Sequence, residues 1–401
     1  MNPQHPGGFF LYKSIGEVPE KFSHITLLYD IEFLFRLNMQ LRLEKIMNMR
    51  PSMGENNLPL YNQFDRPTLE KHIKSSGEER RVLSFYRYVH IDMPQDLRDK
   101  LYLDWRDLGV LGRVYVATEG VNAQISVASD NLDAFLDSLE SYFPHMPIKF
   151  SLDDTPDAFI KLIVRLKKKL VADGLEDSSF DTSNVGKHLS AREFNEALDQ
   201  PDTIVVDVRN HYESEVGHFD GAICPDVCSF REELPVIRDM LEDKKDKKIL
   251  LYCTGGIRCE KTSAWLKHHG FQDVNQLHGG IINYVQQVKS EGLENKFIGK
   301  NFVFDERLGE RVTEDVIANC HVCGEKSDDH TNCKWQACHI LLIMCNSCRE
   351  RLDGCCSEDC MEKTRLSADE QKRLRKIDSG KVPGFFKGKR KPEKVYSNST
   401  I

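Results

Sequence analysis

The segment YCTGGIR, residues 252–258, places a cysteine directly after an apolar run and just ahead of a stretch with helical composition. The first turn of a helix carries unpaired N–H groups and the positive end of the helix dipole. Gly255 and Gly256 allow the loop to curl so that further N–H groups point inward, and Arg258 adds a positive charge. Each effect lowers the pKa of a thiol, and the thiolate is its reactive form. The loop therefore predicts a catalytic site with Cys253 and Arg258, in preference to a cysteine buried only for packing.

A second group of cysteines has the spacing of metal ligands. Nine of the 13 cysteines lie in residues 320–360, and two C-x-x-C pairs begin at Cys320 and Cys345. Such pairs are typical of zinc sites with four ligands, whereas a segment this dense and polar would bury reduced thiols poorly. We expect structural zinc, and the pairing of the ligands stays open. The predicted ligands are Cys320, Cys323, Cys333, Cys338, Cys345, Cys348, Cys356 and Cys360, with Cys355, His330 and His339 as alternatives for the second site.

The composition indicates an intracellular enzyme. The chain has 401 residues, enough for two or three domains, and its 40% hydrophobic and 29% charged residues are ordinary for a globular protein. No signal peptide is recognisable, and charges interrupt the apolar stretch at residues 24–49, so no run reaches the roughly 20 residues that cross a bilayer. Clustered cysteines point to a reducing compartment. We therefore expect a cytoplasmic protein without membrane contact.

Residues 186–292 must supply the elements that position Cys253. The sequence predicts strands at 203–208, 249–251 and 274–277 and helices at 191–198, 232–241, 262–269 and 281–288. Alternating strands and helices indicate a mostly parallel sheet covered on both faces. Ligands bind at the carboxyl ends of the strands in such sheets, and Cys253 lies at one of those ends.

A different order of elements is predicted for residues 80–175. Strands are expected at 82–91, 113–117, 123–127, 148–152 and 159–166, and helices at 94–108 and 132–142. This βαββαβ order is that of a ferredoxin-like module, a fold that does not by itself settle a function. Arg165 and residues 167–169 form a basic cluster near its end, which either faces solvent or contacts phosphate.

Three further segments complete an α/β chain. Residues 1–79 are an N-terminal extension without an assigned function, with an amphipathic stretch at 25–47 and a linker at 51–57. Residues 293–362 form the predicted cysteine-rich, zinc-binding domain. Residues 363–401 are a basic tail that we expect to be disordered, suited either to contact nucleic acid or to keep the protein soluble.

Several motifs resemble known families. The residues 207–209, Glu213, 217–222, the loop 253–258 and the segment 277–281 resemble a rhodanese domain. The resemblance then narrows to the tRNA uridine hydroxylases, whose motifs are similar to residues 118–126, 209–213, 252–261 and 297–307 and to the cysteine cluster. The resemblance covers about residues 80–360, and it is highly specific because several long motifs recur in order.

This resemblance implies oxygen-dependent hydroxylation of the wobble uridine of tRNA at C5, which gives 5-hydroxyuridine. It assigns Cys253 as the active residue, described as a persulfide former by analogy with sulfurtransferases. The implied partner is the anticodon region of tRNA, and molecular oxygen is the co-substrate. No flavin or iron motif is recognisable, so the electron donor stays open.

The chemistry of uracil suggests a role for the thiolate. Uracil C5 is a poor nucleophile until a group adds at C6, and Cys253 could be that group, leaving an enolate at O4 and C5. Asp207 and Arg209 are expected to form a structural ion pair, and Cys259 to be a packed helix residue rather than a sulfur relay. The alternatives are a rhodanese-type sulfurtransferase that carries a persulfide on Cys253, and a zinc-bearing RNA adaptor in which that cysteine is dispensable.

Overall fold

The computed structural model describes residues 60–175 and 180–379, all within one structural unit that spans Gly54–Ile401. The amphipathic stretch predicted at 25–47, the linker at 51–57 and the end of the tail, 380–401, lie outside the described residues. Within the described ranges, no helix has the length and apolar character needed to cross a membrane.

The N-terminal module, residues 80–175, has the predicted ferredoxin-like order. Its strands form one sheet in the order β4-β1-β3-β2-β5, in which β4, β1, β3 and β2 are antiparallel neighbours and β5 adds in parallel to β2. The strand predicted at 159–166 begins only at Leu162. The elements are α2 (Arg66–Ser76), which precedes the module, β1 (Arg80–Tyr88), α3 (Pro94–Asp107), β2 (Leu111–Ala117), β3 (Gly120–Ala128), α4 (Leu132–Tyr142), β4 (Ile148–Phe150) and β5 (Leu162–Leu166).

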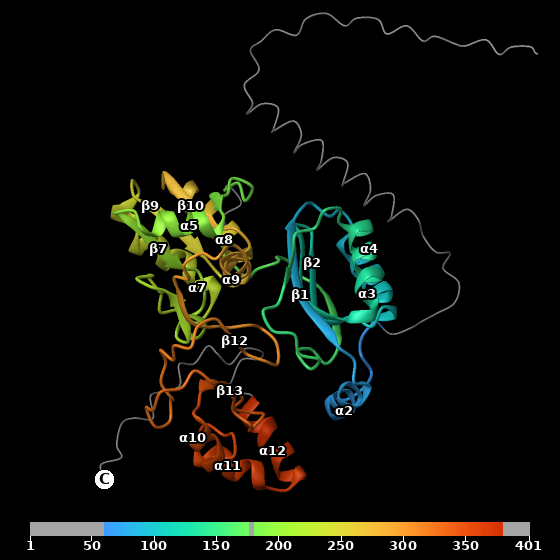
Figure 1. Cartoon of the computed structure of the whole chain (residues 1–401). Helices are drawn as coiled ribbons and strands as arrows, with labels where there is room; N and C mark the ends of the chain where they lie inside the picture. The colour runs from blue at the N-terminus through green and yellow to red at the C-terminus, as the bar shows by residue number, and fades with distance from the viewer. Residues whose placement is uncertain (1–59, 176–179, 380–401) are drawn as a thin grey trace, which may run out of the picture. The chain divides into compact units, whose positions relative to one another are not determined.

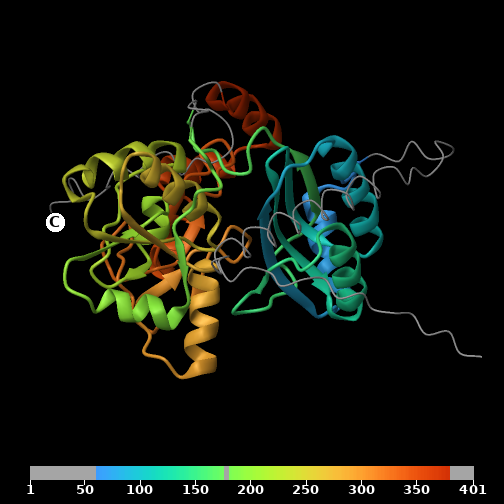
Figure 2. The same cartoon turned by 90° about the horizontal axis from the view of Figure 1, so that it is seen from above.

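Alternation along β1 gives this sheet two different faces. Phe85 is buried against Trp105 of α3 and Phe135 of α4, with ring centroids 6.1 and 6.4 Å away. Because neighbouring side chains of a strand point to opposite faces, Ser84 and Tyr86 lie on the face away from α3 and α4. Figures 1 and 2 show both helices on one side of β1 and β2, with the other side turned toward the second domain.

The rhodanese-like domain is built on the predicted parallel sheet, with strand order β6-β10-β9-β7. Central strand β9 is buried on both faces: Ile249 and Leu251 pack with α7 and α8, whereas Leu250 and Tyr252 pack with α5 and α9. Figure 1 shows these helices around the sheet. The elements are β6 (Lys187–Leu189), α5 (Ala191–Leu198), β7 (Thr203–Asp207), α6 (His211–Ser214), β8 (Gly217–Phe219), α7 (Phe230–Met240), β9 (Lys248–Tyr252), α8 (Ile257–His268), β10 (Asp273–Leu277) and α9 (Gly280–Glu291).

The segment 293–362 was predicted as the cysteine-rich domain, but its first part pairs with a strand of the rhodanese-like domain. There β11 (Phe297–Asn301) pairs antiparallel with β8 and with β12 (Glu310–Arg311). The cysteines follow only from Cys320 onward. Among the nine, Cys348 lies on α10 (Asn346–Arg351) and Cys360 on α11 (Glu358–Arg365). The others lie in loops around the short strands β13 (His330–Asn332) and β14 (Leu341–Ile343).

The prediction of a disordered tail is wrong for residues 363–379. Helix α11 extends to Arg365, and α12 covers Ala368–Ser379. A reciprocal capping arrangement explains the second helix: the Glu370 N–H donates to the Ser367 hydroxyl at 3.4 Å, and the Ser367 N–H donates to the Glu370 carboxylate at 3.3 Å. The charged composition of this segment hid a local helix-start signal.

Candidate active site

Cys253 lies at the predicted place, directly after β9, and its side chain is fully buried. The N–H of Gly256 donates to its Sγ at 3.1 Å. Gly256 has φ of 96°, a left-handed conformation that glycine adopts without strain and that turns the loop back toward the sulfur. Helix α8 begins at Ile257, five residues ahead of the prediction at residue 262, so Arg258 and Cys259 lie in its first turn.

The surroundings of Cys253 favour the thiolate. Burial alone would raise the pKa of this thiol, but the Cys259 thiol, the positive charge of Arg258 and the N–H groups of Arg258 and Cys259 together lower the pKa to about 5. Cys259 is itself fully buried, and burial together with its bond to Cys253 raises the pKa of its own thiol. At neutral pH the protein therefore holds one sulfur negative and the neighbouring sulfur protonated.

Arg258 is held by Glu213, which the sequence indicated only as part of a rhodanese-like motif. Its guanidinium donates to both carboxylate oxygens of Glu213, at 2.6 and 2.8 Å, and the Glu213 side chain is fully buried. Thr254 adds a hydroxyl bond to Glu213 at 3.3 Å. The charge of Arg258 thus acts on the sulfur from a fixed position, and the guanidinium is not free to bind an incoming group.

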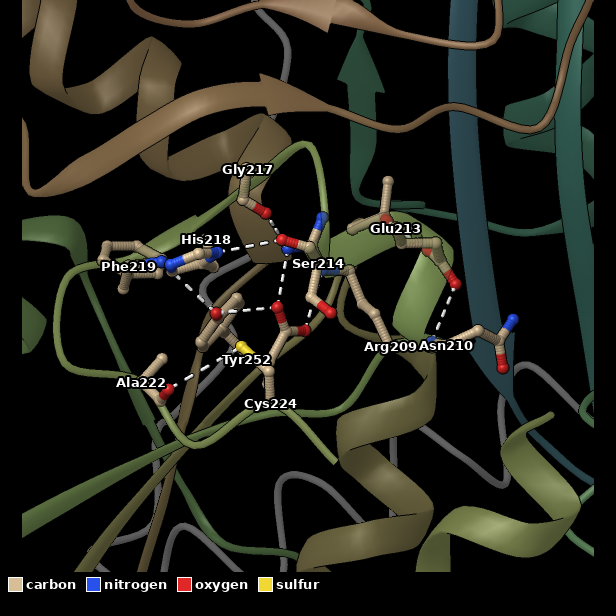
Figure 3. A network of polar contacts seen from close by, with 12 residues as sticks. Arg209, Asn210, Glu213, Ser214, Gly217, His218, Phe219, Ala222, Cys224 and Tyr252 are labelled. Carbon is tan, nitrogen blue, oxygen red and sulfur yellow. Dashed lines mark hydrogen bonds and ion pairs between the residues drawn. The ribbon is translucent and has the colours of Figure 1, made fainter. Parts of the chain in front are cut away.

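The predicted ion pair between Asp207 and Arg209 is confirmed. Both side chains are fully buried, and Arg209 donates to the two carboxylate oxygens at 2.8 and 2.6 Å. Arg209 also donates to the Gly217 carbonyl, while the Tyr252 hydroxyl donates to Asp207 at 2.8 Å. Figure 3 shows part of this network, in which residues at or just after the end of β7, at the start of β8 and at the end of β9 converge. It fixes the strand ends that carry the reactive loop.

A cavity of about 320 Å³ opens beside Cys253, between the two domains of this unit. One wall comes from the rhodanese-like domain and includes Cys253, Thr254, Gly255 and Arg258. The facing wall is the helix-free side of the N-terminal sheet. Its polar and aromatic lining residues include Ser84, Tyr86, Arg113, Tyr115, Asn122, Gln124 and Lys149. A pocket of this size accommodates a small planar ligand.

Buried polar contacts hold the two walls together. Lys261 of α8 donates to Glu119 at 2.7 Å and lies 3.4 Å from Asp173, and only 3% of the Lys261 side chain is exposed. The Tyr86 hydroxyl donates to Glu260 at 2.9 Å. Glu119 belongs to the motif 118–126, so this motif contributes both a docking residue and two lining residues of the cavity.

Lys149 is a residue of the cavity wall that sequence reasoning missed. It lies on β4 between Ile148 and Phe150 with 7% of its surface exposed, and its ammonium lies 4.5 Å from the centre of the Tyr86 ring. A lysine on a short edge strand normally faces solvent, so the residue alone carries no signal. The available signal was the alternation of side chains along three neighbouring strands, which indicates a polar face on the sheet. Alternation does not reveal which domain covers that face.

The cysteine segment brings eight sulfurs into two groups, and within each group the ligand atoms lie within 4.8 Å of one another. Contacts of 3.6 Å join Cys323 to Cys345 and Cys338 to Cys356. Cys355, His330 and His339 belong to neither group among the residues searched. The first group is Cys320, Cys323, Cys345 and Cys348; the second is Cys333, Cys338, Cys356 and Cys360. Four sulfurs gathered in this way could hold a metal ion in tetrahedral geometry.

The fold and site define a rhodanese-like enzyme with an additional N-terminal domain, and comparison with known proteins agrees. Residues 80–170 match the family described as UPF0176 acylphosphatase like domain, residues 190–287 the Rhodanese-like domain, and residues 298–361 the family described as Rhodanase C-terminal. These matches cover both walls of the cavity and the cysteine groups.

Similarity over most of the chain makes the assignment specific. A protein of Leptospira interrogans named tRNA uridine(34) hydroxylase is 52% identical over 337 residues, 84% of this chain and 92% of its own length. Proteins of the same name from Enterobacter sp. (strain 638) and Escherichia fergusonii are each 49% identical over 79% of this chain and 91% of theirs. The chain belongs to the tRNA uridine(34) hydroxylase family.

Proposed function

We propose that this protein hydroxylates C5 of the wobble uridine in tRNA and so produces 5-hydroxyuridine, with molecular oxygen as co-substrate. The name shared by its relatives supports this activity. The observation that carries it here is a cysteine whose pKa is lowered to about 5 and which lines a cavity shared by two domains. Such a site can present a nucleophile to a single base.

Cys253 acts as the nucleophile in this proposal. Its thiolate adds at C6 of uracil, and the electron pair of the C5–C6 double bond moves through C4 to O4. The N–H groups at the start of α8 and the fixed charge of Arg258 hold the sulfur negative before attack. The enolate then offers C5 as a nucleophile.

The hydroxylation balances with an external reductant. One oxygen atom of O₂ becomes the hydroxyl group at C5 and the other becomes water, with two electrons and two protons supplied from outside the protein. Loss of the C5 proton then drives the C6–S bond to break, which restores the double bond and the Cys253 thiolate.

The sulfurtransferase alternative is less favoured. Thiolate stabilisation at Cys253 would serve a persulfide equally well, because both are anions held by N–H groups. A sulfur carrier has no need, however, of a second wall with Asn122, Gln124 and Lys149 facing the cysteine. The zinc-bearing adaptor is less favoured for a related reason: it would require neither a low thiol pKa nor the cavity.

The two cysteine groups suit structural zinc. Each offers four sulfur ligands and leaves no open position, which is the arrangement of zinc sites that stabilise folding. The first group would join the two C-x-x-C pairs, and the second would tie α11 to the loop before β14. We assign to this segment a supporting surface for tRNA. A tRNA substrate and cysteines that are all free of disulfides also suit the cytoplasm.

Purified protein incubated with a defined tRNA, with and without oxygen, tests the function. Mass spectrometry of the digested tRNA should show 5-hydroxyuridine only in the aerobic sample. Replacing the wobble uridine by 5-fluorouridine should trap a covalent complex that requires Cys253. Hydroxylation by Cys253→Ala at the wild-type rate would refute the nucleophilic role, and a thiolated base in place of 5-hydroxyuridine would establish the sulfurtransferase.

A further inference from the structure

Lys149 is a buried cation without a carboxylate partner, at the wall of the cavity that faces Cys253. Its side chain is 7% exposed, and it forms no ion pair or hydrogen bond within residues 60–175 and 180–379. A charge removed from water in this way is costly unless something compensates for it. The position therefore needs an explanation that packing alone does not give.

The aromatic ring below the ammonium supplies part of the compensation. The Lys149 Nζ lies 4.5 Å from the centre of the Tyr86 ring, and the Tyr86 hydroxyl is fixed by its bond to Glu260. On the other side, Lys149 Cε lies 3.8 Å from the point that a Cβ on Gly255 would occupy. An aromatic face stabilises a cation without neutralising it, so the charge stays available to an anion in the cavity.

Cys253 already has its own stabilising groups. The sulfur is served by the Gly256 N–H, by the first turn of α8 and by Arg258, which Glu213 holds in place. Lys149 comes from a different domain, and its stem lies beside Gly255 of the reactive loop. Its ammonium attracts the Cys253 thiolate but forms no hydrogen bond or ion pair within the described residues, so its donors stay available to a ligand between the two walls.

We propose that the cavity takes the unstacked uracil base, and that Lys149 donates a hydrogen bond to O4 and stabilises the enolate formed when Cys253 adds at C6. This inference rests on the proposed function. In the step, the S–C6 bond forms, the C5–C6 π bond breaks, and its electron pair comes to rest on O4 beside the ammonium, which keeps its protons. Preorganised donors aimed at a developing oxyanion are usually the largest contribution to such catalysis.

Two amide side chains extend the same wall. Asn122 and Gln124 lie on β3 and line the cavity, and their side-chain amides form no hydrogen bond within the described part of the chain. Each amide carries both donors and an acceptor, which matches the N3–H donor and the O2 acceptor of uracil. These residues would fix the base with O4 toward Lys149.

The charges around Lys149 predict a pH window. Burial lowers the pKa of its ammonium to about 8, while Cys253 and Glu260 act in the opposite direction. The groups that face it are Tyr86 on β1, Cys253 in the loop, Glu260 on α8 and His278 after β10. The ammonium is present below about pH 8 and the Cys253 thiolate above about pH 5, so activity should be highest between these values.

Substitution of Lys149 tests the assignment. Lys149→Met should lower kcat by about 10²–10³-fold, as loss of one oxyanion donor does, and should reduce trapping by 5-fluorouridine tRNA. The pH midpoint of Cys253 alkylation should rise only slightly in this variant, because Cys259, Arg258 and the N–H groups at the start of α8 remain. Lys149→Arg keeps the charge and should recover part of the rate, with the alkaline limb of the pH profile moved upward. Lys289→Met, an exposed site on α9, is the matched control and should behave as wild type.

Two results would overturn the role of Lys149. One is a Lys149→Met enzyme, folded by circular dichroism, that keeps the wild-type kcat. The other is a loss of rate that higher pH fully restores while the pKa of Cys253 rises, because Lys149 would then serve only the sulfur. Absence of 5-hydroxyuridine with the wild-type protein would instead overturn the proposed function together with this inference, so the two failures are distinguishable.

Discussion

The loop cysteine and the clustered cysteines hold negative sulfur in opposite ways. Cys253 stands beside one protonated neighbour, and N–H groups with the charge of Arg258 stabilise it from fixed positions. In the two cysteine groups, four sulfurs lie within 4.8 Å of one another, and only a shared cation could balance four thiolates at that distance. The N–H dipoles at Cys253 leave sulfur lone pairs available for reaction, whereas a bound metal ion would be coordinated by them. Under the proposed function, one chain would use the same residue type for reactivity in the rhodanese-like domain and for folding in the cysteine-rich segment.

Metal removal should produce the largest effect, because the two cysteine groups depend on a shared cation. The apparent binding free energy of structural zinc in small domains is about 10–16 kcal/mol and contributes directly to folding. A strong chelator should therefore unfold residues 320–360. Emission spectroscopy should find two zinc ions per chain before treatment. Cys345→Ser should lose one of the two ions, whereas Cys355→Ser, outside both groups, should keep both. Zinc-free protein with unchanged circular dichroism would show that the sulfurs need no metal.

Loss of the loop cysteine should abolish catalysis without disturbing the clusters. Cys253→Ala should lower the rate of 5-hydroxyuridine formation by at least about 10³-fold, because the reaction loses its nucleophile. Mass spectrometry of tRNA nucleosides measures the rate, and zinc content is the internal control. A variant that loses zinc as well as activity would show that the two regions are not independent.

Glu213→Gln should weaken the support of the loop. The variant leaves the Arg258 cation buried without its carboxylate, and removal of one partner from a buried ion pair costs about 3–5 kcal/mol. Denaturant unfolding of the zinc-loaded protein measures the loss. Glu242→Gln, which breaks the exposed pair with Lys245, is the matched control and should change stability by less than about 1 kcal/mol. Equal effects of both variants would contradict the importance of burial.

Alkylation across pH should distinguish Cys253 from an ordinary cysteine. Because the pKa of Cys253 is lowered to about 5, its thiolate is fully present above that pH and is lost as the pH falls through it. An ordinary cysteine near pH 7 is thiolate to only a few per cent, so the thiolate fraction of Cys253 should be roughly thirtyfold higher. Peptide mass spectrometry after a brief iodoacetamide pulse identifies the modified residues. An alkylation midpoint near that of free cysteine would contradict a stabilised thiolate.

Local sequence patterns predicted most of the fold, because local signals determine most of it. Strands predicted at 82–91 and 123–127 correspond to β1 and β3, and the apolar run 249–251 predicts the buried strand before Cys253. The start of α8 was predicted too late because its first turn carries Arg258 and Cys259, which helical periodicity alone does not place. The helix at 368–379 was missed because charge outweighed its capping signal.

The site was predictable only from the side of the loop. Glycines and a cysteine after a strand indicate a thiolate within seven residues of sequence. The opposite wall carries Tyr86 and Lys149, which belong to a domain more than a hundred residues earlier in the chain. The sequence of residues 80–150 does not indicate which part of the chain covers this side of the sheet. Pairing of the cysteines was likewise open, because sequence spacing does not say which loops meet.

The single ammonium of Lys261 joins both domains through Glu119 and Asp173. A rhodanese-like domain produced alone would therefore keep an acidic thiol yet have nothing to hold a base above it. It would be reactive without being selective, open to any small electrophile or sulfur donor. Discrimination between nucleic acid and other targets would then require the interface between the two domains, because neither domain alone encloses the cavity.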